Sequence, residues 1–191
     1  IVTGDWSSDV CSSDLLVGAT TRLGNISTPM RDRFGAIFRL DFYQKNEIFK
    51  ILKRTASILE MNVQDDALTE IAGRSRGTPR IANRVLKRVR DFAQVKNVKE
   101  ISLEDARSSL DSIGIDENGL ENMDRKILKN LIVNYNGGPT GGKSLAISIN
   151  EDIQTIEDVY EPYLIKEGFI ERTSRGRIAT DKAYALFDLK K

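Results

Sequence analysis

Apolar residues recur at helical spacing through most of the sequence between residues 44 and 114. Two successive stripes begin at Ile48 and Ala67, and a third follows Pro79, a residue that is favoured in the first turn of a helix. Ser102 opens a Ser-Leu-Glu-Asp sequence that is typical of a capped helix start. The pattern therefore predicts four helices, which form a small helical domain over residues 44–114.

The sequence after residue 117 predicts three more helices followed by a β-hairpin. Residues 169–180 have the pattern of two short strands, with Gly176 in the turn between them. Three helices followed by a hairpin is the order of a winged helix, a relative of the helix-turn-helix that commonly binds DNA. We therefore predict a winged-helix head domain over residues 117–191. Its helices are expected at residues 124–135, 144–149 and 155–167.

Residues 16–43 carry a different pattern, which is typical of the end of an α/β ATPase core. An apolar run at residues 15–19 predicts a buried strand, and residues 37–43 alternate apolar and polar residues as a last strand does. Between them, Thr28 and Pro29 indicate a short helix with a threonine cap and proline in its first position. The expected fold class is therefore mainly α with an α/β remnant.

Two arginines stand in the order in which a ring-shaped ATP motor uses them. Arg33 lies in the sequence Arg-Asp-Arg-Phe, and Arg80 ends the sequence Gly-Thr-Pro-Arg. In such a motor one arginine reaches the γ-phosphate in a neighbouring subunit, and another lies on a lid over its own nucleotide. A guanidinium suits both tasks because it stays charged and presents a rigid fork of donors to phosphate oxygens. Upstream, Thr20 and Thr21 lie where a polar sensor would orient the attacking water.

Together these segments resemble the second half of the RuvB family of bacterial Holliday-junction branch-migration motors, from about residue 16 to the C-terminus. The resemblance implies the end of a AAA+ ATPase core, a small ATPase lid and a winged-helix head. It also implies that the intact subunit is an ATP- and Mg²⁺-dependent DNA helicase or translocase that acts as a homohexamer in recombination, DNA repair and the SOS response. The expected partners are Holliday-junction arms bound without sequence preference, RuvA, and RuvC in the resolving complex.

The resemblance further implies roles for individual residues. Arg33 falls on a family position that contacts ATP and is expected to act catalytically across the subunit interface. Arg31 is so close in sequence that the assignment of this role between the two stays open. Tyr43, at the hinge between core and lid, and Arg80 match nucleotide-contacting positions. The DNA-contacting positions of the family fall on two arginines of the hairpin, Arg172 and Arg177.

Residues 137–144 match the P-loop expression G-x-x-x-x-G-K-[ST], but their context argues against a nucleotide cradle. A working P-loop follows a buried parallel strand and opens a helix, so that backbone amides converge on phosphate. Here a predicted helix precedes the motif, and the motif follows the arginine segments instead of preceding them. We therefore predict a structural turn, and we expect that residues 1–191 by themselves bind neither ATP nor Mg²⁺.

Residues 74–99 contain nine basic residues against a single acidic one, Asp91. A basic stripe of this kind can bind a phosphate backbone. In a ring motor it can equally face an acidic surface of the neighbouring subunit. We favour the subunit interface.

Composition excludes several classes of site. The formal net charge is only +1, so affinity for nucleic acid must come from local clusters. The sequence has no histidine and a single cysteine, Cys11, which excludes zinc fingers, disulfide frameworks and Cys/His catalysis, and no metal ligands are expected. It contains no apolar run near 18 residues and no secretory signal, so a cytoplasmic protein without a membrane span is expected.

Residues 1–15 are rich in serine and aspartate and have no counterpart in the family pattern. We interpret them as a probable non-native segment, such as translated adapter sequence; the alternative is a genuine N-terminal loop. Two other classes of protein also remain open for the chain. A non-enzymatic winged-helix DNA-binding protein has no use for Arg33 or Arg80, whereas a clamp-loader or initiator-type AAA+ ATPase shares the ring arrangement but acts on other DNA structures.

Overall fold

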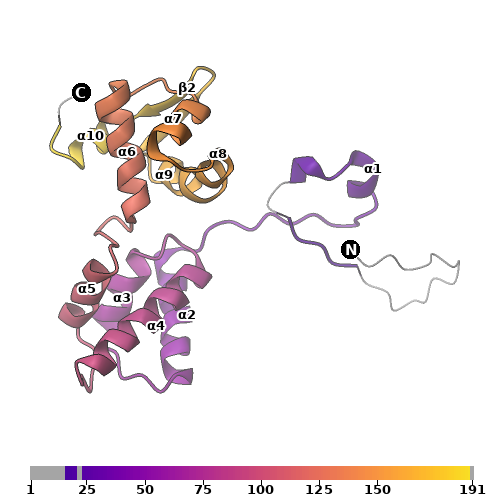
Figure 1. The fold of residues 1–191 in the computed structure, drawn as a ribbon. Coiled ribbons are helices and arrows are strands. Elements are labelled where there is room, and N and C mark those ends of the chain that lie inside the picture. The colour runs from indigo at the N-terminus through magenta and orange to yellow at the C-terminus, as the bar shows by residue number, and fades with distance from the viewer. Residues whose placement is uncertain (1–15, 21–22, 190–191) are drawn as a thin grey trace, which may run out of the picture. The chain divides into compact units, whose positions relative to one another are not determined.

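The computed structural model describes residues 16–20 and 23–189 and divides into two units, residues 1–40 and residues 41–191 (Figure 1). The predicted non-native segment, residues 1–15, and one of the two candidate sensor threonines, Thr21, lie outside the described residues. The other, Thr20, is exposed.

The described residues of the N-terminal unit form two short helical segments. A 3₁₀ turn, η1 (Leu23–Asn25), precedes helix α1 (Thr28–Arg31). Pro29 lies in the first turn of α1, as predicted. The capping position is held by Ser27 instead of Thr28, and its side chain makes no cap hydrogen bond.

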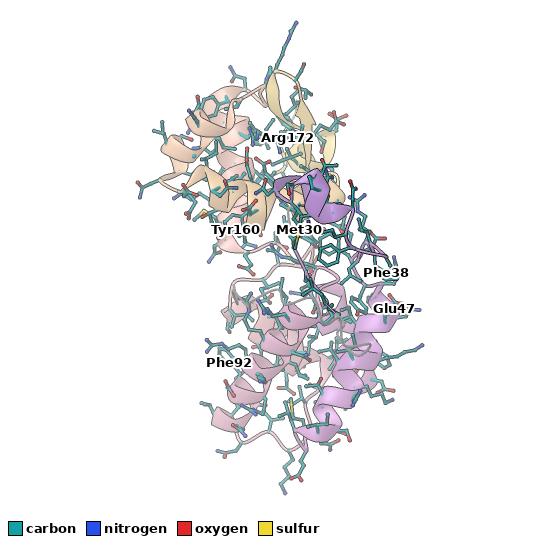
Figure 2. The ribbon with its side chains drawn as sticks, turned by 90° about the vertical axis from the view of Figure 1, so that its right-hand side faces the viewer. Met30, Phe38, Glu47, Phe92, Tyr160 and Arg172 are labelled. Atoms are coloured by element: carbon teal, nitrogen blue, oxygen red, sulfur yellow. The ribbon has the colours of Figure 1, made fainter. Side chains whose placement is uncertain are left out.

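Neither of the two strands predicted in residues 16–43 is present. Residues 16–20 and 37–43 have no strand geometry, and their apolar side chains are exposed: Phe38 (Figure 2) is 84% and Leu40 92% accessible. A strand forms only where its backbone pairs with another strand. In the described part of the chain, the backbone pairs that are present join other segments. The apolar runs and the alternation in these segments therefore did not suffice to predict strands, because no pairing partner is present for them among the described residues.

Four α-helices form the lid, which confirms the helices predicted from the apolar stripes. They pack together around one core, in which Ile48, Ile71, Leu86 and Leu110 are fully buried (Figure 1). The helices are α2 (Lys45–Ile58), α3 (Asp65–Gly73), α4 (Pro79–Val95) and α5 (Leu103–Ser112).

The head has its own core, which includes Leu128, Leu145, Leu164 and Phe169. Its three predicted helices are present, and the third is a continuous helical run with a π-helical centre. The head contains α6 (Asn122–Tyr135), α7 (Gly142–Ile149), α8 (Ile153–Thr155), η2 (Ile156–Tyr160), α9 (Glu161–Lys166) and α10 (Asp181–Ala185).

The hairpin of the head consists of the antiparallel strands β1 (Ile170–Thr173) and β2 (Gly176–Ala179); we call it the wing. Its turn differs by one residue from the prediction, because Gly176 pairs with Thr173 as the first residue of β2. Gly176 has a φ of 139°, and a Cβ atom there would collide with the backbone of Thr140. This glycine therefore permits a close approach of two backbones.

The segment that matches the P-loop expression is a turn between two helices, as predicted. It follows α6 instead of a strand, and Lys143 is exposed on α7. The turn also supports the wing. The backbone groups of Thr140 and Arg177 exchange two hydrogen bonds of 2.9 Å each. None of the helices in the described residues is long and apolar enough to span a bilayer.

Candidate nucleotide and nucleic-acid interface

The lid brings Tyr43 and the start of α4 together. The backbone N–H of Tyr43 donates a 2.9 Å hydrogen bond to the carbonyl of Gly77. Gly77 has a φ of 65°, and a Cβ atom there would lie 2.6 Å from the Tyr43 carbonyl oxygen, so the approach requires glycine. Arg80 follows in the first turn of α4 with an exposed side chain. Two of the predicted nucleotide contacts therefore lie on neighbouring segments, beside a helix N-terminus whose N–H groups favour an anion.

The two arginines after Pro29 have different surroundings. Arg31 donates from Nη2 to Thr28 Oγ1 at 3.1 Å, and its Nε is buried without a hydrogen-bond partner among the described residues. Arg33 lies beyond the end of α1 with an exposed side chain. Of the two candidates for the role across the subunit interface, Arg33 is the one whose side chain is presented to solvent.

The wing carries three arginines that differ in exposure. Arg175, in the turn, is exposed, and the side chain of Arg172 (Figure 2) is 55% accessible. Arg177 pairs directly opposite Arg172 in the sheet, yet its side chain is only 8% accessible. Arg177 donates to Glu157 and Glu161 of the third helix, at 2.6 Å each.

This burial of Arg177 differs from the solvent-facing position that a direct DNA contact calls for. Burial alone disfavours the charged guanidinium, but the hydrogen bonds to Glu161 and Glu157 outweigh that effect and raise the pKa of Arg177 above its ordinary value. Arg172 shares the same acidic partners more loosely, at 3.3 Å from Glu157 and 3.8 Å from Glu161. Arg177 is therefore held inside the head, while Arg172 is only partly engaged.

The basic stripe of residues 74–99 does not form one surface. Arg74 and Arg76 are buried in ion pairs within the protein. Four of the other seven basic residues line a groove along α4. The groove is lined by Arg80, Asn83, Arg84, Lys87, Arg88 and Asp91.

The sequence did not indicate which residues join the lid to the head. Arg76, from the loop before α4, ion-pairs with Asp124 of α6 and lies over the ring of Tyr163, 4.7 Å from its centroid. These residues are far apart in sequence, so no local pattern marks them as partners. The one available signal is the Arg-Gly-Thr-Pro sequence at residues 76–79, which places an arginine beside a glycine that needs a positive φ. Among the described residues, no group of acidic residues is arranged to hold a metal ion.

A four-helix lid with an arginine in the first turn of its third helix, followed by a winged helix, indicates the class: the lid and winged-helix domains of a AAA-type ATPase. Two family models match the chain accordingly. The RuvB AAA lid domain matches residues 43–116, and the RuvB C-terminal winged helix domain matches residues 117–188. The chain belongs to the RuvB family.

Relatives and solved structures agree with this assignment. The Holliday junction branch migration complex subunit RuvB of Fusobacterium nucleatum is 51% identical over 172 residues, which are 90% of this chain and 52% of that protein. The subunit of the same name from Oleidesulfovibrio alaskensis is 54% identical over 174 residues, covering 91% of this chain and 54% of the relative. The chain therefore spans about half the length of these curated relatives.

The structure of the Thermotoga maritima RuvB Holliday junction branch migration motor superposes with a TM-score of 0.84 at 46% identity, covering 88% of this chain and 56% of that one. A mutant of the same protein gives a TM-score of 0.87 at 47% identity, covering 91% and 58%. The match to an AAA lid removes the alternative of a stand-alone winged-helix protein, and the RuvB-specific models argue against a clamp loader or initiator.

Proposed function

We propose that this chain supplies the lid and the DNA-binding head of an ATP-driven subunit that moves Holliday junctions. The observation that carries the proposal is the connection, in one chain, of a lid bearing Tyr43 and Arg80 to a winged helix bearing exposed wing arginines. The proposed activity of the intact subunit is that of an ATP-dependent translocase of the helicase type on four-way DNA. The relatives' names, which refer to Holliday junction branch migration, support it.

In this proposal Tyr43 and Arg80 contact the subunit's own nucleotide, and Arg33 contacts the nucleotide of a neighbour. Exposure of Arg33 and the engagement of Arg31 with Thr28 favour Arg33 for the second role. A guanidinium there stabilises the charge that develops on the transferred phosphoryl group. Mg²⁺ accompanies ATP in the intact subunit.

The wing is proposed to bind the phosphate backbone of duplex DNA without sequence preference. Arg172 and Arg175 are exposed enough to contact phosphates directly. Arg177 supports the wing through its ion pairs with Glu161 and Glu157, and a phosphate would compete with Glu157 for its Nη2. Phosphate contacts position a protein on DNA but carry no sequence information, as a motor that moves along any sequence requires.

Salt titration of DNA binding tests the wing. The chain should bind a duplex labelled with a fluorophore, and the affinity should be independent of its sequence. Arg172→Ala and Arg175→Ala should each weaken binding and lower the slope of log K against log salt by about 1, because each removes one phosphate contact. Fluorescence anisotropy at several salt concentrations measures both quantities.

A matched control is Lys129→Ala, which removes an exposed positive charge from α6 of the same domain and lies outside the wing sequence. It should leave the slope unchanged. If Lys129→Ala and the two wing variants lower the slope equally, binding follows the general charge of the head and the proposed wing interface is wrong.

Residues 1–191 alone are proposed neither to bind nor to hydrolyse ATP. The only P-loop-like sequence in the chain is the turn before α7, whose backbone is engaged with β2. The exposed ammonium of Lys143 gains little from phosphate in water at physiological salt. Calorimetry with Mg-ATP should give no saturable heat, with or without Lys143→Ala. Micromolar binding that Lys143→Ala abolishes would refute this part of the proposal.

The remaining proposals concern the assembly. Following the family, the intact subunit is proposed to form a homohexamer in the cytoplasm, to act with RuvA on the junction and to join RuvC in the resolving complex. The groove along α4 supports a basic surface for a neighbouring subunit, since four of its six lining residues are cationic.

A further inference from the structure

The loop between α3 and α4 inserts two buried arginines into the connection between lid and head. Arg74 donates from Nε and Nη2 to Glu70 within the lid, at 3.0 and 2.7 Å. Its third nitrogen, Nη1, donates to the carbonyl of Ile115 at 3.1 Å and to Asp111 at 3.2 Å. Arg74 therefore fixes the point at which the chain leaves the lid.

Arg76 reaches further, into the head itself. Its Nε donates to the carbonyl of Gly119 at 3.0 Å, its Nη2 ion-pairs with Asp124, and its guanidinium lies over the ring of Tyr163. Asp124 is fully buried, and burial raises its pKa, while Arg76 opposes that shift. A carboxylate, a carbonyl and an aromatic face together surround this guanidinium. They hold its orientation and also stabilise its positive charge.

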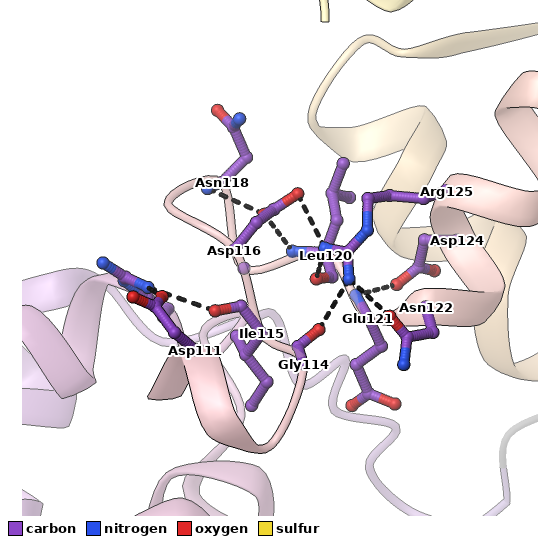
Figure 3. A network of polar contacts seen from close by, with 12 residues as sticks. Asp111, Gly114, Ile115, Asp116, Asn118, Leu120, Glu121, Asn122, Asp124 and Arg125 are labelled. Atoms are coloured by element: carbon purple, nitrogen blue, oxygen red, sulfur yellow. Dashed lines mark hydrogen bonds and ion pairs between the residues drawn. The ribbon is translucent and has the colours of Figure 1, made fainter. Parts of the chain in front are cut away.

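The segment of the head that receives Arg76 is held by a network of hydrogen bonds and an ion pair (Figure 3). Asp116 accepts from the backbone N–H groups of Asn118 and Leu120, at 3.0 and 2.8 Å. Arg125 of α6 donates to Asp116 at 3.0 Å and to the carbonyls of Gly114 and Leu120 at 2.9 and 2.8 Å. Residues 114–125 thus form a braced connection instead of a flexible linker.

The aromatic partner of Arg76 closes the junction from the third helix of the head. The hydroxyl of Tyr163 donates to the carbonyl of Asn118 at 2.7 Å. Burial first, and then the charge of Glu167, raise the pKa of Tyr163 to about 12, so this donor keeps its proton at neutral pH. The junction therefore links the loop before α4 to both the first and the third helix of the head.

The same loop reaches the proposed nucleotide contacts. Gly77, next to Arg76, holds the backbone of Tyr43, and Arg80 follows three residues later. Lys166, at the end of the third helix of the head, lies over the ring of Phe42, 4.5 Å from its centroid. Residues 76–80 therefore connect the head to the proposed nucleotide site: Arg76 contacts the head, and Arg80 is a proposed nucleotide contact.

We infer that Arg76 is a positioning residue that fixes the direction of the DNA-binding head relative to the lid, so that a movement of the lid with its nucleotide is passed to the wing. The role in passing movement to the wing rests on the proposed function. The fixed orientation of the head relative to the lid does not, and it can be measured in the isolated chain without ATP or DNA.

The test is the distribution of distances between lid and head in the full 191-residue chain. With Cys11→Ser as background, Ser57→Cys on α2 and Lys143→Cys on α7 place spin labels at exposed positions of the two domains, and double electron–electron resonance measures their separation. The background chain should give one narrow distribution. The combination Arg76→Asn with Asp124→Asn should give a distribution at least twice as wide.

The choice of variant avoids two artefacts. Arg76 has a φ of 57°, a conformation that asparagine tolerates better than most residues. Replacing Asp124 as well leaves no unpaired buried carboxylate, which would unfold the head for an unrelated reason. Arg88→Asn, an exposed arginine of α4 outside the junction, is the matched control and should keep the narrow distribution.

A second measurement separates positioning from folding. The helical circular dichroism signal and the affinity of the wing for duplex DNA should stay within about twofold of the background chain in the double variant. A narrow distribution in that variant would overturn the inference. A wide distribution accompanied by loss of helix signal or DNA affinity would also overturn it, because Arg76 would then maintain the folded head. If every chain, background included, fails to bind DNA, the proposed function is refuted. The distance distributions and the circular dichroism signal then still test whether Arg76 positions the head.

Discussion

The arginine side chains discussed above fall into two groups, which their burial distinguishes. Arg33, Arg80 and Arg175 are exposed and available to phosphate. Arg76 and Arg177 are buried against carboxylates, where a charge is tolerated only because a partner of opposite sign is present. The sequence predicts the charge of such residues but not their partners: Arg76 pairs with a residue 48 positions away, and Arg177 with one 16 positions away.

Substitution should destabilise the fold much more at the buried arginine of the wing than at the exposed one. Arg177→Ala leaves Glu161, which is 2% accessible, without its guanidinium, and should lower the free energy of unfolding by about 3–5 kcal/mol. Arg175→Ala, two residues earlier and exposed, should change it by less than about 0.5 kcal/mol. Urea denaturation followed by circular dichroism compares the two. Equal, small effects would mean that the ion pairs of Arg177 do not hold the wing.

At the scale of secondary structure, the helices were predictable because their signals are local. The stripes that begin at Ile48 and Ala67, and the proline that opens α4, lie within the helices that they predict. The strands predicted at residues 15–19 and 37–43 failed because a strand depends on a partner that its own sequence does not specify. The hairpin of the wing was predicted correctly because its two strands are adjacent in sequence and pair with each other.

The start of α5 provides a test of a helix signal that depends on pH. Ser102 and Asp105 form a reciprocal capping box, in which the hydroxyl and the backbone N–H of Ser102 both donate to Asp105 and lower its pKa below the ordinary 3.8. An acid whose pKa is lowered by folding stabilises the fold above its unfolded pKa, and the benefit is lost as the pH falls through the folded value. Asp105→Asn should therefore cost about 0.5–1 kcal/mol at pH 7.

That cost should shrink in urea titrations carried out below pH 3.8, because the carboxylate of the unsubstituted chain then becomes protonated. Glu104→Gln, an exposed acid in the same turn of α5, is the control for a general loss of negative charge near the helix start. A cost for Asp105→Asn that stays constant with pH, or is matched by Glu104→Gln, would show that the capping box does not stabilise α5.

At the scale of the whole molecule, the lid and the head each have a separate core, and a braced connection joins them. The candidate site is divided in the same way. Tyr43 and Arg80 lie on the lid, and Arg172 and Arg175 on the wing. The sequence and its family resemblance predicted the two domains and named Tyr43, Arg80 and Arg172. They gave Arg177 as the second DNA contact of the wing, whereas the structure buries Arg177 and exposes Arg175. The sequence did not predict Arg76 and Asp124, because a domain junction depends on single long-range contacts that leave no periodic pattern.

We propose that this chain completes an ATP-driven motor for four-way DNA, and a chimaera can measure that activity. Residues 16–191 would replace the matching part of the Fusobacterium nucleatum RuvB relative, and ATP-dependent conversion of a labelled four-way junction into duplexes would be measured in the presence of RuvA. The chimaera should move junctions, and Arg33→Ala should reduce its ATP hydrolysis by about 10³-fold or more, with a much smaller effect for Arg31→Ala. A chimaera that hydrolyses ATP but leaves the junction in place would show that the chain does not complete such a motor. A chimaera whose ATP hydrolysis survives Arg33→Ala would show that Arg33 does not act on the nucleotide.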